Sequence, residues 1–261
     1  MNFETILYEE INGVAIIRLN RPGQLNAMNE QLMRDVIQAC TLITENPSVR
    51  AAVITGAGRA FSAGGDVQEI KQGYGGEIGF LAHMHLVNNM ILALAELSKP
   101  LIAAVNGVAT GMGMNTALCA DIILAAEDAR FSQIFGKIGL VPDSGGSYLL
   151  ARLIGLAKAK ELIFSSRIIE AQEAQTLGLV NRIIPSDELL PEALALAETL
   201  AQGPTFAMIT AKKMIHNCYS VDLRTALDNE ASAQVLAAGT ADHAEGICAF
   251  QEKRRPVFIG R

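Results

Sequence analysis

The sequence predicts an α/β fold in which buried strands alternate with helices, followed by a helical C-terminal segment. Half of the 261 residues are hydrophobic, which is enough for a sizeable core. Apolar runs rich in β-branched residues alternate with helical periodicities as far as Asp143, and this alternation indicates strands covered by helices on both faces. Beyond Asp143 the pattern is helical almost throughout.

The first elements in this order are a hairpin and a helix. Residues 5–10 and 14–19 are rich in β-branched residues and meet at Asn12-Gly13, a pair typical of a two-residue hairpin turn. Asn29 is the expected N-cap of a helix that runs to about residue 44, because the apolar residues after it recur at helical spacing.

The later elements are separated by Gly, Pro or Asp. Strands are predicted at 49–55, 101–105 and 122–125, with a helix at 80–97, and further helices at 148–154, 158–164, 187–201, 205–217, 222–238 and 242–253. Gly203-Pro204 suggests a boundary, so we predict a catalytic core over 1–200 and a helical oligomerisation segment over 201–261. About sixty helical residues bury little apolar surface alone, so this segment should pack on the core or on another subunit.

Composition excludes several classes of function. A net charge of -6 argues against non-specific nucleic-acid binding, which needs a cationic face. The four cysteines include no CxxC pair, and no histidine stands at zinc-ligand spacing, so neither disulfides nor a structural metal is predicted and a cytoplasmic location fits best. The N-terminus lacks the features of a signal peptide. Residues 101–126 are long enough to span a membrane, but polar residues and glycines interrupt them, and we interpret them as buried core.

Two glycine-rich turns follow predicted strands, Ala63-Gly64-Gly65-Asp66 and Gly111-Met112-Gly113. Small residues at such junctions leave backbone N–H groups free to point at an oxyanion. The alternative for either turn alone is that its glycines only allow close packing of strand on helix. Two donors on one oxygen would form an oxyanion hole. A dinucleotide-binding interpretation of residues 56–61 fails because Phe61 stands where the third glycine should be.

Five ordered motifs resemble the crotonase, or enoyl-CoA hydratase/isomerase, superfamily over nearly the whole chain. They are LNRPGQLNAMN at 19–29, FSAGGDVQEI at 61–70, KPLIAAVNGVATGMGMNTALCADI at 99–122, IGLVPDSGGSYLLARLIG at 138–155 and AQTLGLVNRIIP at 174–185. The resemblance implies a spiral of ββα turns and a C-terminal helical segment that assembles trimers, often dimers of trimers. It also implies an acyl-CoA substrate and no other cofactor.

The resemblance also assigns the site residues. The backbone amides of Gly65 and Met112 would form the oxyanion hole. The residues that would contact CoA or the rest of the substrate are Gln24, Ala27, Ala63, Gly64, Asp66, Gly111 and Gly113. An alternative role for Asp66 is that of a helix cap only.

The departures from the family pattern concern the acid/base groups. The two glutamates of the family's hydratases fall here on Asn115 and Phe135, neither of which can exchange a proton at neutral pH. One carboxylate remains, Asp143, in a run that resembles the ring-opening isomerases of phenylacetate breakdown. Shifting a double bond needs only one base, which should be desolvated to work near neutral pH. The alternative is that Asp143 caps the helix that starts near Gly146.

Other functions stay open as alternatives to the isomerase. A hydratase would need an unusual water site, and a non-catalytic acyl-CoA-binding subunit would also explain the missing glutamates. A protease suggested by PDSGGS does not fit, because the chain turns helical directly after the motif. His83 and His85 have no assigned role and are expected to be packing or surface residues. Residues 71–79, with four glycines, are expected to form a mobile wall of the acyl pocket.

Overall fold

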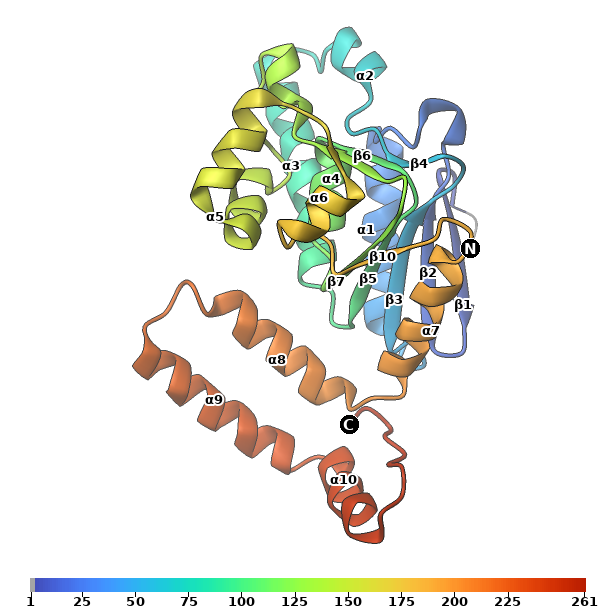
Figure 1. Cartoon of the computed structure of the whole chain (residues 1–261), viewed down its shortest axis with the longest axis vertical. Helices are drawn as coiled ribbons and strands as arrows, with labels where there is room; N and C mark the ends of the chain where they lie inside the picture. The colour runs from blue at the N-terminus through green and yellow to red at the C-terminus, as the bar shows by residue number, and fades with distance from the viewer. Residues whose placement is uncertain (1–2) are drawn as a thin grey trace.

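The computed structural model describes residues 3–261 and consists of two β-sheets covered by helices (Figure 1). The larger sheet has the strand order β1-β2-β3-β5-β7-β10, and the smaller has the order β4-β6-β8-β9. β1 and β2 are antiparallel, as are β8 and β9, whereas all the other neighbouring strands of the two sheets are parallel. The predicted α/β class is therefore confirmed.

Strands and helices alternate along the chain. The larger sheet contains β1 (Ile6–Ile11), β2 (Val14–Leu19), β3 (Ala51–Gly56), β5 (Leu101–Val105), β7 (Ile122–Ala126) and β10 (Arg182–Ile184). The smaller contains β4 (Ala60–Ser62), β6 (Val108–Thr110), β8 (Arg130–Ser132) and β9 (Ile169–Glu170). The helices are α1 (Glu30–Glu45), α2 (Val67–Gln72), α3 (Glu77–Ala95), α4 (Met112–Leu118), α5 (Gly146–Ser165), α6 (Ala171–Thr176), α7 (Leu189–Ala201), α8 (Thr205–Asn217), α9 (Leu223–Ala238) and α10 (Ala241–Glu252), with 3-10 turns η1 (Pro22–Gln24) and η2 (Ile134–Ile138).

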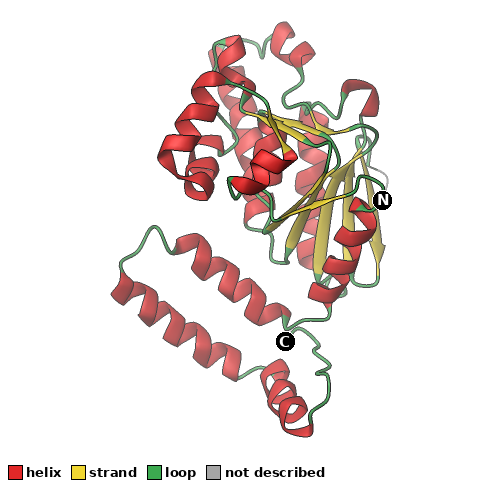
Figure 2. Ribbon diagram, in the orientation of Figure 1, coloured by secondary structure: helices red, strands yellow, loops and turns green. Residues whose placement is uncertain are grey.

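The two sheets are built from a repeated ββα unit. In the pairs β3/β4, β5/β6 and β7/β8, the first strand enters the larger sheet and the second enters the smaller one. Helices follow each pair before the chain returns to the larger sheet, and Figure 2 shows them around the strands of both sheets. This is the spiral of ββα turns that the resemblance implied. The unit repeats in the structure although the sequence shows no internal repeat.

The hairpin and the central strands form as predicted. Asn12 and Gly13 both have positive φ, 52° and 79°, which is the requirement of the tight turn that joins β1 to β2. Every residue of β3 and β5 is buried, because helices cover both faces of the parallel part of the sheet. The apolar run at 101–126 is therefore mostly core, as expected, and includes β5, β6, α4 and β7.

Helix α3 is the one described helix with the length and apolar composition of a membrane span. Such a single helix is weak evidence for a membrane, because core helices pass the same test. One face of α3 is buried and the helix packs along α1.

The last three helices extend away from the two sheets (Figure 1). α8 and α9 run side by side, and α9 buries none of its sixteen residues in the described chain. Arg50, just before β3, ties this segment to the core: its Nε donates to Thr205 Oγ1 at 3.0 Å and its Nη1 donates to Phe258 O at 2.8 Å. The predicted boundary at Gly203-Pro204 lies in the turn between α7 and α8.

The two helices predicted at 148–154 and 158–164 are confirmed: they form the two arms of α5, which are separated at Gly155 by a non-helical φ of 76° and ψ of 160°. The prediction missed the strands of the smaller sheet and β10. These strands have two or three residues each, too few to show a period of two, and they form because longer segments bring their partners together.

Candidate active site

Three parallel strands of the smaller sheet end at one edge, and each runs into a predicted or potential site segment. β4 leads into residues 63–66, β6 into residues 111–113 and β8 into residues 133–135. Carboxyl ends of parallel strands meet at the same edge, so distant parts of the sequence become neighbours there. Hydrogen bonds link them: Thr110 Oγ1 donates to Ala63 O at 2.9 Å, and Gly111 N donates to Ser132 O at 2.8 Å.

The N–H group of Gly65 is free because of the way its neighbours pair. Met28 N donates to Gly64 O at 2.8 Å, and Asp66 N donates to Met28 O at 3.0 Å, so Gly65 forms a parallel bridge with Met28. In such a bridge the central residue turns its own N–H to the opposite side. Within residues 3–261 that N–H has no acceptor.

The N–H group of Met112 is free because Met112 is the first residue of α4, and first-turn amides have no partner within their helix. Close packing places it beside the other turn. A Cβ built at Gly64 would lie 2.7 Å from Thr110 O and 3.6 Å from Met112 N, and a Cβ built at Gly113 would lie 2.3 Å from Ser62 O. The glycines therefore permit this close contact between the two turns, and each turn also carries one unpaired amide, that of Gly65 or that of Met112.

The stretch from Gln24 to Ala27 lies along the first turn. Ala63 N donates to Leu25 O at 2.9 Å, and Ala27 N donates to Gln24 O at 3.0 Å. Gln24 is exposed, Ala27 is buried and Ala63 is half-buried. The structure thus brings these three predicted ligand residues to the same edge as Gly64 and Gly65.

Asp66 has a structural role. Its carboxylate accepts from Gln68 N at 2.9 Å as the N-cap of α2, and it forms an ion pair with Arg21 at 2.8 Å. Both interactions occupy a side chain that is otherwise buried. The cap that the sequence allowed is therefore present, and any ligand contact of Asp66 is a separate question.

Neutral side chains occupy the two positions that the resemblance assigns to the hydratase glutamates. Asn115 is fully buried; its Nδ2 donates to Asp143 O at 2.9 Å, and its Oδ1 accepts from Gln133 Nε2 at 2.7 Å. Phe135 is buried, and its Cζ lies 3.6 Å from a Cβ built at Gly111. Asn115, one turn after Met112, thus fixes the backbone of Asp143 in place of donating or accepting a proton.

Asp143 is a half-buried carboxylate in a tight turn. Oδ1 accepts from Ser144 Oγ at 2.6 Å, and burial raises the pKa of this carboxyl above its ordinary value, while Ser144 and the charge of His83 act in the opposite direction. Gly145 is the N-cap of α5, and no side chain caps this helix. The alternative role of Asp143 as a side-chain helix cap is therefore wrong.

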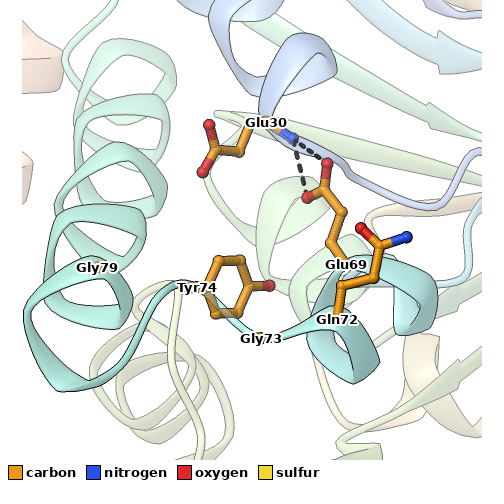
Figure 3. A pocket seen from close by; sticks show the side chains of 6 residues that line it. All are labelled: Glu30, Glu69, Gln72, Gly73, Tyr74 and Gly79. Atoms are coloured by element: carbon orange, nitrogen blue, oxygen red, sulfur yellow. Dashed lines mark hydrogen bonds between the residues drawn. The ribbon is translucent and has the colours of Figure 1, made fainter.

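A cavity of about 390 Å³ lies between α1, α2 and the start of α3, and it contains residues that sequence reasoning missed. Figure 3 shows the ring of Tyr74 and the side chain of Glu30 at this cavity. Glu30 N donates to the carboxylate of Glu69 at 3.2 and 3.3 Å. The predicted wall, residues 71–79, supplies Gln72, Gly73, Tyr74 and Gly79.

Burial raises the pKa of Tyr74 to about 12, and four carboxylates act in the same direction, the largest effect among them coming from Glu69. Tyr74 therefore stays protonated near neutral pH, so its hydroxyl carries no charge and can donate or accept a hydrogen bond. The one signal for this region was the glycine content of 71–79; nothing in the sequence linked it to the start of α1.

Comparison with known proteins identifies the family of this chain. The family model for enoyl-CoA hydratase/isomerase matches residues 9–261. A probable enoyl-CoA hydratase of Mycobacterium tuberculosis is 40% identical over 100% of both chains, and the 1,2-epoxyphenylacetyl-CoA isomerase of Escherichia coli is 36% identical over 99% of both. The solved enoyl-CoA hydratase from Bacillus anthracis has a TM-score of 0.93 and 35% identity over 99% of this chain and 100% of that one.

The chain belongs to the enoyl-CoA hydratase/isomerase family. Enzymes of this family act on acyl-CoA and need no cofactor besides the CoA of the substrate. Among residues 3–261 no three His, Cys, Asp or Glu side chains group in a way that could hold a metal ion. The fold is that of the crotonase-type enoyl-CoA hydratases.

Proposed function

We propose that this family member is an enoyl-CoA isomerase that shifts a double bond with one base, Asp143. The observation that carries the proposal is the set of side chains around α4, where neutral residues replace two carboxylates and one other carboxylate is present. The positions that the resemblance assigns to the hydratase glutamates hold Asn115 and Phe135, and Asn115 holds the backbone of Asp143, a carboxylate whose pKa is raised by burial. The name of the isomerase relative from Escherichia coli supports the same assignment.

The reaction begins with polarisation of the thioester. Its carbonyl oxygen accepts hydrogen bonds from the amides of Gly65 and Met112, which makes the carbon between the carbonyl and the double bond more acidic. The carboxylate of Asp143 removes a proton from that carbon, and the electrons of the broken C–H bond spread into a dienolate. The protonated Asp143 then returns the proton two carbons away, which leaves the double bond conjugated with the carbonyl and the enzyme unchanged.

The binding groups proposed for the rest of the substrate lie beside these amides. Gln24, Ala27, Ala63, Gly64 and Asp66 would follow the CoA chain, and Gly111 and Gly113 would flank the thioester. Backbone and small residues dominate this set, so binding should depend little on the protonation of side chains.

Hydration of an enoyl-CoA is the second candidate, because the Mycobacterium tuberculosis and Bacillus anthracis relatives are named as hydratases. It would require a water site other than the usual glutamate pair. A direct comparison separates the two: the isomerase should convert a 3-enoyl-CoA to the conjugated 2-enoyl-CoA much faster than it hydrates crotonyl-CoA. Comparable rates would favour the hydratase, and acyl-CoA binding with neither reaction would favour a non-catalytic subunit.

The proposed assembly is a cytoplasmic homotrimer or hexamer in which residues 201–261 form contacts between subunits. The support is the apolar surface of this segment, which includes exposed Leu223, Leu227, Val235, Leu236, Ile247 and Phe250. Sedimentation velocity of the full chain tests the assembly; a monomer at micromolar concentration would contradict it.

A further inference from the structure

Arg21, just before η1, has a guanidinium group that contacts two segments of the candidate site. Its Nη1 donates to Ala27 O and to Asp66 Oδ2, the latter at 2.8 Å. The side chain of Arg21 is 18% exposed and that of Asp66 is 9% exposed, so this ion pair lies largely away from solvent. A pair of this kind adds little to stability on balance, because desolvation of the two charges offsets their attraction.

The two acceptors of Arg21 lie next to the residues that form the β-bridge. Ala27 directly precedes Met28 in the sequence. Asp66 directly follows Gly65, the residue that pairs with Met28. One nitrogen atom of Arg21 therefore holds both chains of the bridge beside the point where they pair. Because the bridge sets the direction of the Gly65 N–H, a shift of either chain would turn that amide.

The backbone of Arg21 is itself fixed by hydrogen bonds. Arg21 O accepts from Gln24 N and from Asn26 N, each at 2.9 Å, and Arg21 N donates to Asn26 Oδ1 at 2.9 Å. Asn26 is fully buried, and its Nδ2 donates to Ala57 O at 2.9 Å and to Ala60 O at 2.7 Å. The guanidinium group therefore extends from a turn that is anchored where β3 leads into β4.

A different role for Arg21 would be to bind a phosphate of CoA, because it precedes the stretch from Gln24 to Ala27. Its Nη1 already has two acceptors within the chain, and most of its side chain is buried. The geometry therefore favours a role in holding the protein over a role in binding an anion.

We propose that Arg21 is a positioning residue of the oxyanion hole: by holding Ala27 and Asp66 together, it keeps the N–H of Gly65 aimed at the thioester oxygen. Arg21 acts through Asp66 and the bridge, without contact to the substrate. The inference rests on the proposed role of the Gly65 amide as a donor, and not on the proposed base Asp143. Without the two hydrogen bonds of Arg21, a thioester should still bind, but its carbonyl should be less polarised.

The polarisation is tested by infrared difference spectroscopy of bound butyryl-CoA labelled with ¹³C at its carbonyl. This saturated thioester has no double bond to shift, and hydrogen bonds to its carbonyl oxygen lower the C=O stretching frequency. Binding to the wild-type protein should lower the frequency, and binding to Arg21→Gln should lower it less. Arg182→Gln is the matched control and should keep the full shift, because Arg182 also pairs with a carboxylate, that of Glu192 at 3.7 Å, but at an exposed position of β10.

The coupling of Arg21 to Asp66 is tested by a double-variant cycle on kcat for isomerisation of a 3-enoyl-CoA. Arg21→Gln should lower kcat by about tenfold while KM changes by less than about threefold, because a displaced donor weakens the transition state more than binding. Asp66→Asn can still cap α2 but loses the ion pair, so it should have a similar effect. The double variant should be no slower than either single variant, because both break the same contact. Arg21→Lys keeps the charge and should restore part of kcat.

A full carbonyl shift with wild-type kcat in folded Arg21→Gln would overturn the inference. A rise in KM with kcat unchanged would also overturn it and would favour the role in CoA binding. Thermal melting shows whether each variant folds. If Arg21→Gln folds poorly, Arg21→Lys takes its place, with a carbonyl shift below that of the wild type expected and a full shift contradicting the inference.

Gly64→Ala distinguishes this failure from failure of the proposed function, because it strains the first turn directly. A carbonyl shift that is reduced in Gly64→Ala but complete in Arg21→Gln would refute the role of Arg21 alone. A complete shift in both variants would refute the proposed oxyanion hole, and the inference with it.

Discussion

The two halves of the candidate site differ in what builds them. One half, Gly65 and Met112, is backbone: its donors are free because a β-bridge turns one amide outward and a helix begins at the other. The other half, Asp143 with Asn115, is made of side chains on α4 and in the turn before α5. The first half depends on the fold, and the second depends on residue identity.

This difference explains how one fold can carry different reactions. In the proposed mechanism the amides would polarise a thioester in either case, so exchanging carboxylates around them would change the fate of the proton without disturbing the sheet. Asn115, at a position that the resemblance assigns to a hydratase glutamate, donates a hydrogen bond that holds the backbone of Asp143. Each of the following experiments alters one half and asks whether the other keeps working.

The largest effect is expected from Asp143→Asn. Removing the base should lower kcat by about 10²- to 10⁴-fold, the usual contribution of general acid–base catalysis. Acyl-CoA affinity measured by calorimetry should stay within a few-fold, because the amides of Gly65 and Met112 do not depend on this side chain. Asp187→Asn, an exposed aspartate before α7, is the control. Loss of binding together with turnover would show that the two halves are not separable.

Gly64→Ala should damage the backbone half. Its φ of +96° is unfavourable for alanine, and the added methyl group would lie 2.7 Å from Thr110 O, so the turns must move apart. We expect kcat/KM to fall by about 10²-fold, as when one oxyanion donor is lost. Gly246→Ala in α10 provides the comparison, since its new methyl group meets only Phe258 at an ordinary contact distance. Full activity of Gly64→Ala would argue that the glycines serve packing elsewhere.

Asn115→Ala should have an intermediate effect, because Asn115 acts on Asp143 through its backbone. The variant removes the hydrogen bonds of Asn115 with Asp143 O, which still accepts from Gly146 N, and with Gln133 Nε2, which keeps only the weaker acceptor Met114 Sδ. The expected cost is about 1–3 kcal/mol in unfolding free energy by chemical denaturation. We expect kcat to fall by about tenfold with KM changed little. Asn88→Ala, at an exposed position of α3, should change neither quantity. A rise in KM alone would place Asn115 in binding instead.

The smallest effect concerns stability and pH. Burial raises the pKa of Asp143, so its charged form disfavours the folded state and its protonated form does not. Asp143→Asn should therefore raise Tm by a few degrees at most at neutral pH. The gain should vanish as the pH falls through the raised pKa, because the wild-type carboxyl then becomes neutral as well. Calorimetric melts at several pH values check the sign; a gain that grows on acidification would contradict it.

The sequence predicted the fold more completely than the site. β2, β5 and α8 lie at the predicted residues, because each has a clear apolar pattern and Gly, Pro or Asn at its ends. The glycine turns were also found in advance, since their φ values and contacts permit few other residues. The role of each as a donor stays a prediction.

What the sequence could not show is the meeting of distant segments. Glu30 follows an ordinary N-cap, and His83 stands in an apolar helix next to another histidine, so neither has a local pattern that marks it. Their approach to 3.6 Å depends on how α1 packs along α3, over fifty residues apart in sequence. Likewise, only the packed turn shows that Gly145, and not Asp143, is the cap of α5.

Because α9 buries none of its residues within its own chain, the stability of this helix should depend on protein concentration. A helix of sixteen residues that buries none of them in its own chain gains little stability from tertiary packing. Contacts with another subunit would supply this stability, and by mass action the stabilisation would increase with protein concentration. Helicity measured by circular dichroism should then fall on dilution as the helices of the last sixty residues lose structure. The two sheets and the free amides of Gly65 and Met112 should persist.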